Sequence, residues 1–511
     1  MEIIDDKALL LRLKNPAHVL ASVPDSRRVD DHKVVVRWGV PQTQALRELG
    51  IKAPSPIERK YSWPGKFKPM SHQIETAAFF TMNKRAFCFS SQGTGKTASA
   101  IWAADYLMQQ GIIKRVLVIC PVSIMDAAWR NDLFSFAMHR KVDVAHGSAA
   151  KRRKIIQSDA EFIIINYDGV KVSFDDLANG GFDLIIVDEA SAYQNAQTAR
   201  WKTLQKLISE DTWLWMMTGT PAAQGPDNAY GLAKLVNPRG VPRFFNAFRD
   251  MVMYKITNFK WGVKDTAHET VHRVLQPAIR FTKEECLDLP DLVYVRRDVP
   301  MTPQQKRFYD RMRKDLLMEA AGEQVTAGTA AVAMTKLLQL SSGSLYTDDQ
   351  NTLQFDISTR YKVLKEVLAE TPHKSIIFVP FRNTIELLRD KLTEDNVTCE
   401  VISGGVPAAE RSQIFKRFQE TDSPHVLIIQ PQSAAHGVTL TAADTIVWWG
   451  PTASLEIYEQ ANARIHRQGQ KNKCTIVQMV GSPMERRVYD LLDSKVDLHR
   501  KVIDLYDNAL D

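Results

Sequence analysis

A glycine-rich turn at 91–97 carries residue types that can hold the phosphate groups of a nucleotide. An apolar run at 86–89 precedes it and a helical run at 98–106 follows it, so we expect a strand to lead in and a helix to lead out. The glycines let the backbone wrap around phosphate oxygens, and amide groups at the helix start point at the anion. We predict a phosphate site formed by Gln92, Gly93, Thr94, Gly95, Lys96 and Thr97.

Further residues complete the chemistry of such a site. The Lys96 ammonium can reach the β- and γ-phosphates, and the Thr97 hydroxyl can be a ligand of Mg²⁺. Asp188 and Glu189 follow an apolar run at 184–187, where the first can hold Mg²⁺ through water and the second can activate an attacking water. Upstream, the amide of Gln73 can both donate to and accept from adenine. We predict ATP and Mg²⁺ as cofactors, Thr97 and Asp188 as metal ligands, and Lys96, Asp188 and Glu189 as catalytic residues.

These residues require a sheet to position them, and short apolar runs predict one. The runs are too short for helices and too apolar for half-exposed strands, as is typical of buried parallel strands. Helical stretches alternate with them, which predicts an α/β fold with parallel sheets. They form two groups, within 87–217 and 375–480, and the stretch 223–372 between the groups lacks a strong strand pattern. We interpret that stretch as inserted helical material. The runs lie at 116–119, 162–165, 184–187, 214–217, 375–379, 426–429, 445–449 and 475–480.

The composition narrows the class of protein. The chain has 511 residues, 44% hydrophobic and 24% charged, which excludes disordered and fibrous proteins and suggests about three domains. The net charge of +7 permits a polyanionic partner without requiring one. No apolar run reaches the ~18 residues of a membrane span, and acids stand near the start where a secretory signal carries lysine and arginine. The five cysteines lie far apart. We expect a cytoplasmic protein with no membrane association, disulfide framework or zinc module.

The order of the motifs resembles that of superfamily-2 helicases, and within them the Swi/Snf-like family of DNA-dependent ATPases. In sequence order these are the glutamine at 73, GTGKT at 93–97, DEAS at 188–191, TGTP at 218–221 and ARIHRQGQ at 463–470. The resemblance covers about 65–500, and the last string is most similar to bacterial and bacteriophage members. It implies two tandem RecA-like parallel-sheet lobes with helical insertions, a small N-terminal appendage and a C-terminal helix.

The resemblance also implies roles for residues of the second lobe. Arg464 and Arg467 would reach the γ-phosphate bound by the first lobe, with Gln460 beside them as a contact to the γ-phosphate or water. Gly437 would belong to the nucleotide site. For His466 a packing role and a role in the ATP site both stay open. The chain departs from the family pattern with Ala463 before the first arginine, with Ser191 in the DEAS string, and with alanines and a histidine at 434–436.

The family contacts the backbone of one strand of duplex DNA through loops at strand ends, and such contacts carry little sequence information. We expect these domains: an accessory region at 1–64, a first lobe at 65–285 with an insertion at 223–285, and a second lobe at 286–511. The second lobe would have a helical insertion at 300–350 and a C-terminal brace helix. Parts of 1–64 are similar to the HARP-type module of annealing helicases, and a small β-α appendage on the first lobe is the alternative. The expected DNA contacts are Pro121, Ser123, Asn166, Thr220, Pro221, Arg382, Gln432 and Ser433.

The resemblance implies a DNA translocase that hydrolyses ATP to ADP and phosphate while moving on duplex or branched DNA. Fork remodelling, branch migration and strand annealing are the activities we expect, in replication, recombination or repair. The alternatives are a strand-separating helicase on DNA or RNA, and a DNA-binding subunit that uses ATP as a switch. We expect a monomer with duplex, forked or branched DNA as its partner, together with replication or recombination proteins.

Overall fold

The computed structural model describes residues 1–65, 67–222, 225–257, 261–286, 289–322, 327–346, 352–434 and 438–494. The chain forms two compact units. The described residues of the first unit lie within 1–253 and 263–286, and those of the second lie within 289–494, 254–257 and 261–262. Within the described residues, no helix combines the length and apolar character needed to cross a membrane.

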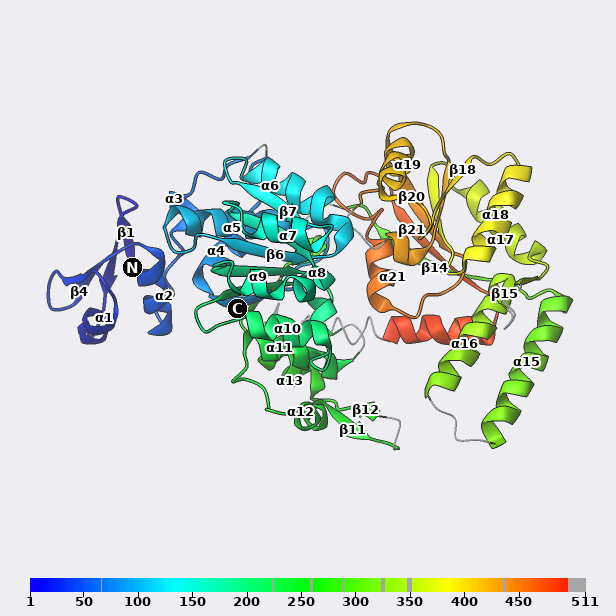
Figure 1. Ribbon diagram of the computed structural model, residues 1–511, viewed down its shortest axis with the longest axis horizontal. Helices are drawn as coiled ribbons and strands as arrows, with labels where there is room; N and C mark the ends of the chain where they lie inside the picture. The colour runs from blue at the N-terminus through cyan, green and yellow to red at the C-terminus, as the bar shows by residue number, and fades with distance from the viewer. Residues whose placement is uncertain are drawn as a thin grey trace. The chain divides into compact units, whose positions relative to one another are not determined.

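A seven-stranded parallel sheet forms the centre of the first unit (Figure 1). Four of its strands, at 213–217, 184–188, 116–120 and 162–166, are buried along their whole length, which explains why their sequences are almost entirely apolar. In spatial order the strands are β13 (Ala278–Ile279), β5 (Arg85–Cys88), β10 (Trp213–Met217), β9 (Leu184–Asp188), β6 (Val116–Cys120), β8 (Phe162–Asn166) and β7 (Val142–Ala145).

Helices cover both faces of this sheet, and alternate strand residues divide between two cores. Leu117 and Ile119 belong to one core, whereas Val116 and Val118 belong to the other. One face packs against α4 (Ser71–Met82), α5 (Lys96–Gln109) and α6 (Asn131–Phe136). The other packs against α7 (Ala149–Ile156), α8 (Tyr167–Val172), α9 (Phe174–Ala178), α10 (Ala199–Leu207), α11 (Ala229–Val236), α12 (Phe245–Val252) and α13 (Ala267–Val274).

Short elements connect these strands and helices. The 3₁₀ turns are η1 (Val122–Ile124), η3 (Ala190–Tyr193) and η4 (Pro226–Asn228), and η2 (Met125–Arg130) is a π-helix. The remaining elements of this part of the chain are β11 (Met253–Lys255), β12 (Trp261–Val263) and α14 (Lys283–Cys286).

The first 60 residues form a small β-α module with its own core, packed against α4. Its antiparallel sheet has the order β1 (Glu2–Ile4), β2 (Ala8–Arg12), β4 (Lys33–Arg37) and β3 (Ser26–Arg28), with α1 (Ala17–Ser22), α2 (Val40–Glu48) and α3 (Ile57–Lys60) beside it. The hydroxyls of Ser55 and Thr81 lie 2.8 Å apart, and the Gln44 amide donates to the Thr81 carbonyl at 3.1 Å. These bonds attach the module to the first unit. The strands of this module are only three to five residues long, which makes them difficult to recognise from sequence.

A buried carboxylate on α5 connects the end of this module to the rest of the first unit. Asp105 is fully buried and accepts hydrogen bonds from Tyr61 Oη at 2.6 Å, Arg140 Nε at 2.6 Å and Gln109 Nε2 at 2.9 Å. A ring nitrogen of His139 lies 2.9 Å from the same carboxylate. Because a buried charge is costly unless it is paired, this network stabilises the position of α5 behind the phosphate turn.

We expect Tyr61→Phe to lower the free energy of unfolding of the first unit by about 2 kcal/mol, because it removes a hydrogen bond to a buried charge. Tyr106→Phe is a matched control. Its ring centroid lies 5.7 Å from that of Tyr61, and its buried hydroxyl has no hydrogen-bond partner among the described residues. Urea denaturation followed by hydrogen exchange in peptides from α5 checks both variants. Equal effects of the two substitutions would contradict the assignment.

A six-stranded parallel sheet forms the second unit. Helices α17 (Ser358–Glu370) and α18 (Arg382–Glu394) cover one face, and α19 (Ala408–Glu420) and α21 (Leu455–Asn462) cover the other. The strands in spatial order are β14 (Leu292–Asp298), β21 (Cys474–Val480), β20 (Ala443–Trp448), β17 (Lys374–Phe378), β19 (Val426–Ile429) and β18 (Cys399–Ile402), and the four-residue helix α20 (Pro431–Ala434) follows β19.

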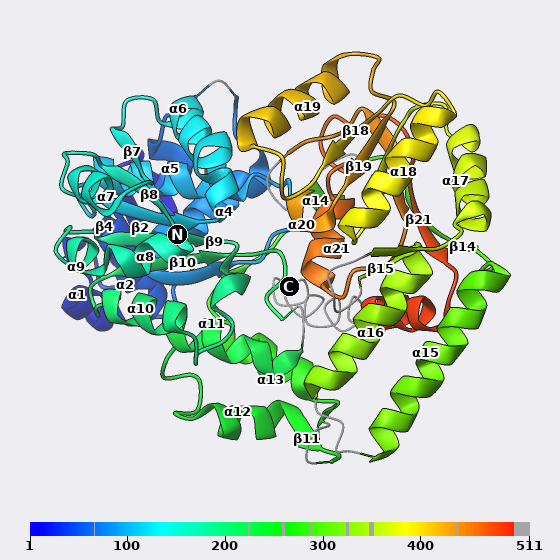
Figure 2. The same ribbon diagram turned by 45° about the vertical axis from the view of Figure 1, so that its right-hand side comes forward.

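The stretch at 223–372 contains both helices and strands, whereas we predicted helical material alone. Helices α15 (Pro303–Gly322) and α16 (Ala327–Ser342) lie side by side (Figures 1 and 2), and a hairpin of β15 (Ser344–Tyr346) and β16 (Thr352–Gln354) follows. The same stretch also contributes β13 and β14 to the two central sheets. Strand β14 is an edge strand whose residues alternate between partly buried and exposed, so it lacks the apolar run by which buried strands are recognised.

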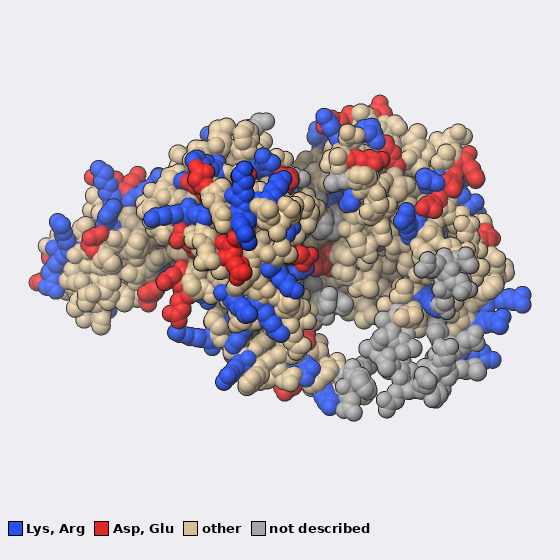
Figure 3. Space-filling view, in the orientation of Figure 1, with Lys and Arg blue, Asp and Glu red and all other residues tan. Residues whose placement is uncertain are grey.

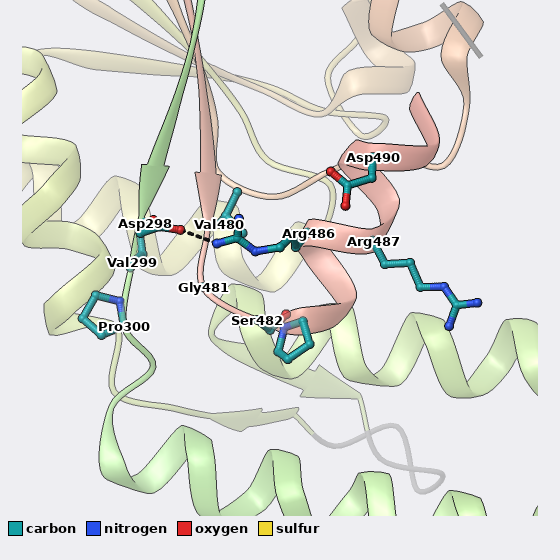
Figure 4. Close-up of a pocket in the computed structure, with 10 residues that line it drawn as sticks. Asp298, Val299, Pro300, Val480, Gly481, Ser482, Arg486, Arg487 and Asp490 are labelled. Atoms are coloured by element: carbon teal, nitrogen blue, oxygen red, sulfur yellow. Dashed lines mark hydrogen bonds and ion pairs between the residues drawn. The ribbon is translucent and has the colours of Figure 1, made fainter. Parts of the chain in front are cut away.

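A helix at 483–494 closes the described part of the second unit, and the remainder of the predicted C-terminal helix lies outside the described residues. Glu485 caps the start of this helix by accepting from the amides of Gly481 and Ser482, and it pairs with the buried Arg360 at 2.7 Å. Figure 4 shows a pocket of about 620 Å³ beside this helix start, where Arg486 bonds to Asp298 at 2.6 Å. None of the residues that line this pocket is a predicted site residue.

Candidate nucleotide site and strand-end loops

The glycine-rich turn at 91–97, called the phosphate turn from here on, connects β5 to α5. Its conformation requires glycine at two positions. Gly93 and Gly95 have φ angles of +85° and +81°, in the left-handed region that side chains disfavour. Lys96 Nζ donates to the carbonyls of Ser90 at 2.7 Å and Ser91 at 3.1 Å, so the ammonium group lies inside the turn. The Thr94 hydroxyl donates to the Ser91 carbonyl at 2.8 Å. The turn therefore has the form of a phosphate cradle with its cation in place.

Ser90 has a structural role, at the position where the phosphate-binding pattern GxxxxGK[ST] has its first glycine. Its side chain is buried, and its hydroxyl accepts from the amide of Phe281 at 3.0 Å. The amide of Ser91 in turn donates to the Phe281 carbonyl at 2.9 Å. These bonds attach the phosphate turn to the segment that follows β13.

The first turn of α4 contacts the phosphate turn directly. Gln73 Oε1 accepts from the Met70 amide at 2.9 Å, and its Nε2 lies 3.4 Å from the Thr94 carbonyl. A Cβ atom at Gly95 would lie 2.0 Å from the same Nε2, so a side chain there would displace the Gln73 amide. His72 is buried and its ring nitrogen lies 2.8 Å from the Thr94 carbonyl. Sequence reasoning predicted Gln73 for this site and missed His72, whose partner is a backbone atom that no motif specifies.

The predicted metal ligand Asp188 is buried at the carboxyl end of β9, and both of its oxygens are engaged. Oδ2 accepts from the indole Nε1 of Trp129 at 2.8 Å, and Oδ1 accepts from the amide of Glu189 at 3.0 Å. Burial raises the pKa of Asp188, while the Trp129 hydrogen bond and the charge of Lys96 oppose that rise. Burial and the charge of Asp188 also raise the pKa of Asp132 to about 6. Asp188 therefore interacts electrostatically with both Lys96 and Asp132 at this edge of the sheet.

Glu189 has a strained backbone. Its φ of +48° is unusual for a residue other than glycine, and such conformations persist where the surroundings hold them. The Tyr167 hydroxyl supplies one restraint, because it lies 2.7 Å from the Asp188 carbonyl and 3.1 Å from the Glu189 carbonyl. The hydrogen bonds of Tyr167 and Trp129 to this site were not predicted from sequence, since each residue reaches the site from a segment that follows a neighbouring strand.

The residues at this edge fit a magnesium ion. Mg²⁺ prefers oxygen ligands and usually combines one or two carboxylates with phosphate oxygens and water. The Asp188 carboxylate and the Thr97 hydroxyl, in the first turn of α5, are donors of that kind. Among the described residues no group of three or more His, Cys, Asp and Glu could hold a metal by itself.

In the second unit, the two predicted arginines converge on one backbone oxygen. Nη1 of Arg464 and Nη1 of Arg467 lie 3.3 Å and 3.2 Å from the Val438 carbonyl. Arg464 is 6% exposed, and burial lowers the pKa of Arg467. Gly437, the neighbour of Val438 and a predicted nucleotide contact, lies outside the described residues. The structure thus places the two arginines of this motif next to a segment that lies about 26 residues earlier in the chain.

The other residues of this motif mainly build the turn. Gln460 is buried, and its amide donates to Glu456 at 3.3 Å on the same helix. His466 is buried with a ring nitrogen 2.8 Å from the Pro290 carbonyl, which favours the packing role. Gln470 donates to the carbonyls of Ala443 at 2.8 Å and Ile465 at 3.1 Å. The sequence prediction had not assigned Gln470 a role.

The predicted DNA contacts of the first unit lie at the ends of adjacent parallel strands, so they share one edge of the sheet with Asp188. Pro121 and Ser123 follow β6, Asn166 ends β8, and Thr220 with Pro221 follows β10. Ser123 is exposed, whereas Asn166 and Thr220 are 7% and 4% exposed. In this structure, of these five residues, only Ser123 has an exposed side chain.

The predicted contacts of the second unit follow the same arrangement. Arg382 begins α18 directly after β17 and is exposed, and Gln432 and Ser433 lie on α20 after the neighbouring strand β19. On the face shown in Figure 3, basic and acidic side chains are interspersed over both units. That distribution is compatible with contacts made by individual loops.

Comparisons with known proteins agree with this geometry. A model of the SNF2-related domain matches residues 72–351, more than half of the chain, and a model of the helicase conserved C-terminal domain matches 359–469. The chain belongs to the SNF2-related family. The resemblance to Swi/Snf-like proteins is thereby confirmed, as is the α/β fold with two tandem RecA-like parallel-sheet lobes.

Several curated proteins are similar to this SNF2-family chain. An uncharacterized ATP-dependent helicase of Mycoplasma genitalium is 22% identical over 423 residues, which cover 80% of this chain and 39% of the relative. The chromodomain-helicase-DNA-binding protein 1-like of Danio rerio is 24% identical over 438 residues, or 81% of this chain and 41% of the relative. The chain thus spans about two fifths of the length of these relatives. A solved SWI2/SNF2 ATPase core of Sulfolobus solfataricus in complex with dsDNA covers 86% of this chain, and 94% of its own length is matched, at 22% identity and a TM-score of 0.42.

Proposed function

We propose that this SNF2-family chain is an ATP- and Mg²⁺-dependent DNA translocase that hydrolyses ATP to ADP and phosphate while moving on duplex or branched DNA. One observation supports this most strongly. The cation of Lys96 lies inside a phosphate turn at the same sheet edge where Asp188 and Glu189 end a buried strand. Phosphoryl transfer depends chiefly on positioning and on compensation of charge, and these groups supply both.

Each group has a separate task in this proposal. The turn and Lys96 hold the β- and γ-phosphates, and Gln73 contacts adenine. Thr97 and Asp188 hold Mg²⁺, which when bound would neutralise charge on the phosphate oxygens. Glu189 orients and activates the attacking water. The strained backbone of Glu189, held by the Tyr167 hydroxyl, supports this role because such strain persists at sites of function.

The second unit contributes positive charge in the same proposal. Arg464 and Arg467 compensate the charge that develops on the γ-phosphate, with Gln460 and Gly437 as neighbouring contacts. In the described structure Nη1 of each arginine donates to the Val438 carbonyl. A γ-phosphate can compete with this neutral carbonyl for the two guanidinium groups, since hydrogen bonds between two charged groups are about twice as strong as neutral ones.

DNA contact in this proposal goes through the sugar-phosphate backbone. Loops that follow the strands of each sheet would make it, at Pro121, Ser123, Asn166, Thr220 and Pro221 and at Arg382, Gln432 and Ser433. The module at 1–64, ahead of lobes at 65–285 and 286–511, would select the DNA structure. The module has its own hydrophobic core and is hydrogen-bonded to α4, which supports a separate accessory role for it. Fork remodelling, branch migration and strand annealing are the activities we propose for it.

ATP hydrolysis measured with single-stranded, duplex, forked and four-way DNA, with RNA as a control, tests this function. We expect duplex and branched DNA to raise kcat, and RNA to leave it unchanged. A triplex-displacement assay should show movement, while tailed duplexes should stay paired. Separation of those duplexes would indicate a strand-separating helicase. If no DNA raises the rate, a DNA-bound ATP switch becomes the better description.

A further inference from the structure

A buried tryptophan makes a direct hydrogen bond to the predicted metal ligand. Trp129 is fully buried, and its indole Nε1 donates to Asp188 Oδ2 at 2.8 Å. Because the Glu189 amide occupies the other carboxylate oxygen, the two bonds together fix the plane in which this carboxylate lies. Each carboxylate oxygen can accept more than one bond, so the indole leaves capacity for a metal ion or its water.

Trp129 lies on a segment with unusual geometry. Helix η2 is a π-helix, a form that is rare and often marks functional sites. It follows η1 without a break, and η1 begins immediately after Pro121 at the end of β6. The residues ahead of Trp129 include Val122, which is 54% exposed, and the exposed Ser123. This short segment therefore has exposed side chains near its start. Near its end it has a buried side chain that donates a hydrogen bond to Asp188.

The hydrogen bond from the Trp129 indole to Asp188 has an electrostatic effect in addition to the packing of the ring. Asp188 is buried, and a buried carboxylate needs hydrogen-bond donors to remain charged, which the indole N–H of Trp129 supplies at 2.8 Å. Partners in the outer shell that orient metal-binding carboxylates typically contribute 10- to 100-fold to metal affinity or activity. A donor that is uncharged also leaves the negative charge of the carboxylate available to a cation.

We propose that Trp129 is a positioning residue that orients the Asp188 carboxylate for Mg²⁺ and links it to the strand-end segment at 121–124. The proposal rests on the function proposed above, in which Asp188 holds Mg²⁺ and that segment contacts DNA. A change in the segment on binding of DNA is carried along η1 and η2 to the indole, and so to the carboxylate. Contact with DNA thereby alters how well the nucleotide and its Mg²⁺ are held.

Trp129→Phe tests the proposal in the full-length chain, because phenylalanine keeps an aromatic ring and removes the N–H. Binding of a fluorescent non-hydrolysable ATP analogue is measured during a titration with Mg²⁺, and also in its absence. We expect the Mg²⁺ concentration at half-maximal binding to rise on the order of 10-fold, with Mg²⁺-free binding unchanged. We also expect the factor by which duplex DNA raises ATP hydrolysis to fall roughly fivefold.

Trp201→Phe is the matched control. Trp201 is a buried tryptophan of the same unit whose Nε1 donates to the Gly231 carbonyl at 2.8 Å, on α10 and α11. It should leave both measurements unchanged. If Trp201→Phe and Trp129→Phe shift them equally, the effect is one of packing and the proposal is wrong.

The two measurements separate the parts of the proposal. An unchanged Mg²⁺ titration in Trp129→Phe would overturn the positioning role, and an unchanged stimulation factor would overturn the link to 121–124. If DNA fails to stimulate the unaltered protein, the proposed function and the link fail together. The Mg²⁺ titration still decides the positioning role in that case. If nucleotide binding by the unaltered protein does not depend on Mg²⁺, the positioning role of Trp129 is wrong.

Discussion

Arg467→Ala should lower kcat for ATP hydrolysis on the order of 10³-fold, which is the range found when an arginine that stabilises a transferring phosphoryl group is lost. The guanidinium of this residue makes its described bond to the Val438 carbonyl, and burial lowers its pKa. The guanidinium is therefore partly removed from water, and an approaching phosphate would bind it more strongly than it would in bulk water. Binding of ATP should change much less than turnover, because the charge it compensates develops only during transfer.

Steady-state ATPase kinetics, together with binding of a non-hydrolysable ATP analogue, measure this effect. Arg389→Ala is the control, since Arg389 is an exposed arginine of the same unit that pairs with its neighbour Asp390. It should retain normal activity. Arg464 is the more buried of the two motif arginines, so its replacement should also cost stability. Near-normal kcat in Arg467→Ala would transfer the principal role to Arg464 or to another residue.

Glu189→Gln should lower kcat by about 10²- to 10⁴-fold, the usual contribution of a positioned general base, while ATP continues to bind. The substitution keeps the size of the side chain and removes its ability to take a proton. It also leaves the hydrogen bond from Tyr167 to the Glu189 carbonyl in place, because that bond involves the backbone. A single-turnover measurement with radiolabelled ATP distinguishes slow chemistry from slow release of product.

Glu210→Gln is the matched control for this prediction. Glu210 is an exposed glutamate of the same unit, in the loop before β10, so the same chemical change there should leave turnover intact. The general-base assignment is wrong if Glu189→Gln hydrolyses ATP at the normal rate. Loss of ATP binding in this variant would instead indicate a structural contribution to the nucleotide site.

Much of the first lobe could be predicted from sequence because its signals are local. The turn at 91–97 needs glycine where φ is positive, and Gly93 and Gly95 have that conformation. The apolar runs correspond to strands because a parallel sheet covered on both faces leaves few positions for polar residues. The pair Asp188–Glu189 could be recognised because it follows such a run directly. In each case one short segment contains both the residue and the sequence pattern from which its position can be predicted.

Features built from distant segments escaped recognition. Strand β14 alternates between partly buried and exposed residues and becomes a strand by pairing with β21, about 180 residues later in the chain. His72 meets the carbonyl of Thr94, and Trp129 meets Asp188 across 59 residues. A histidine or a tryptophan in an apolar segment has the same local pattern whether it packs in a core or orients a site residue. Only the partner atom distinguishes the two.

The sequence by itself determined the family, the parallel-sheet architecture and the residues at the phosphate turn, since each depends on a short pattern with one main physical explanation. Tertiary structure alone decided how those residues are held: Ser90 bonded to Phe281, both arginines on the Val438 carbonyl, and the indole of Trp129 on Asp188. Hydrogen bonds of this kind join atoms that are close in space and far apart along the chain. Their directions follow from the packing of strands and helices, which no single segment encodes.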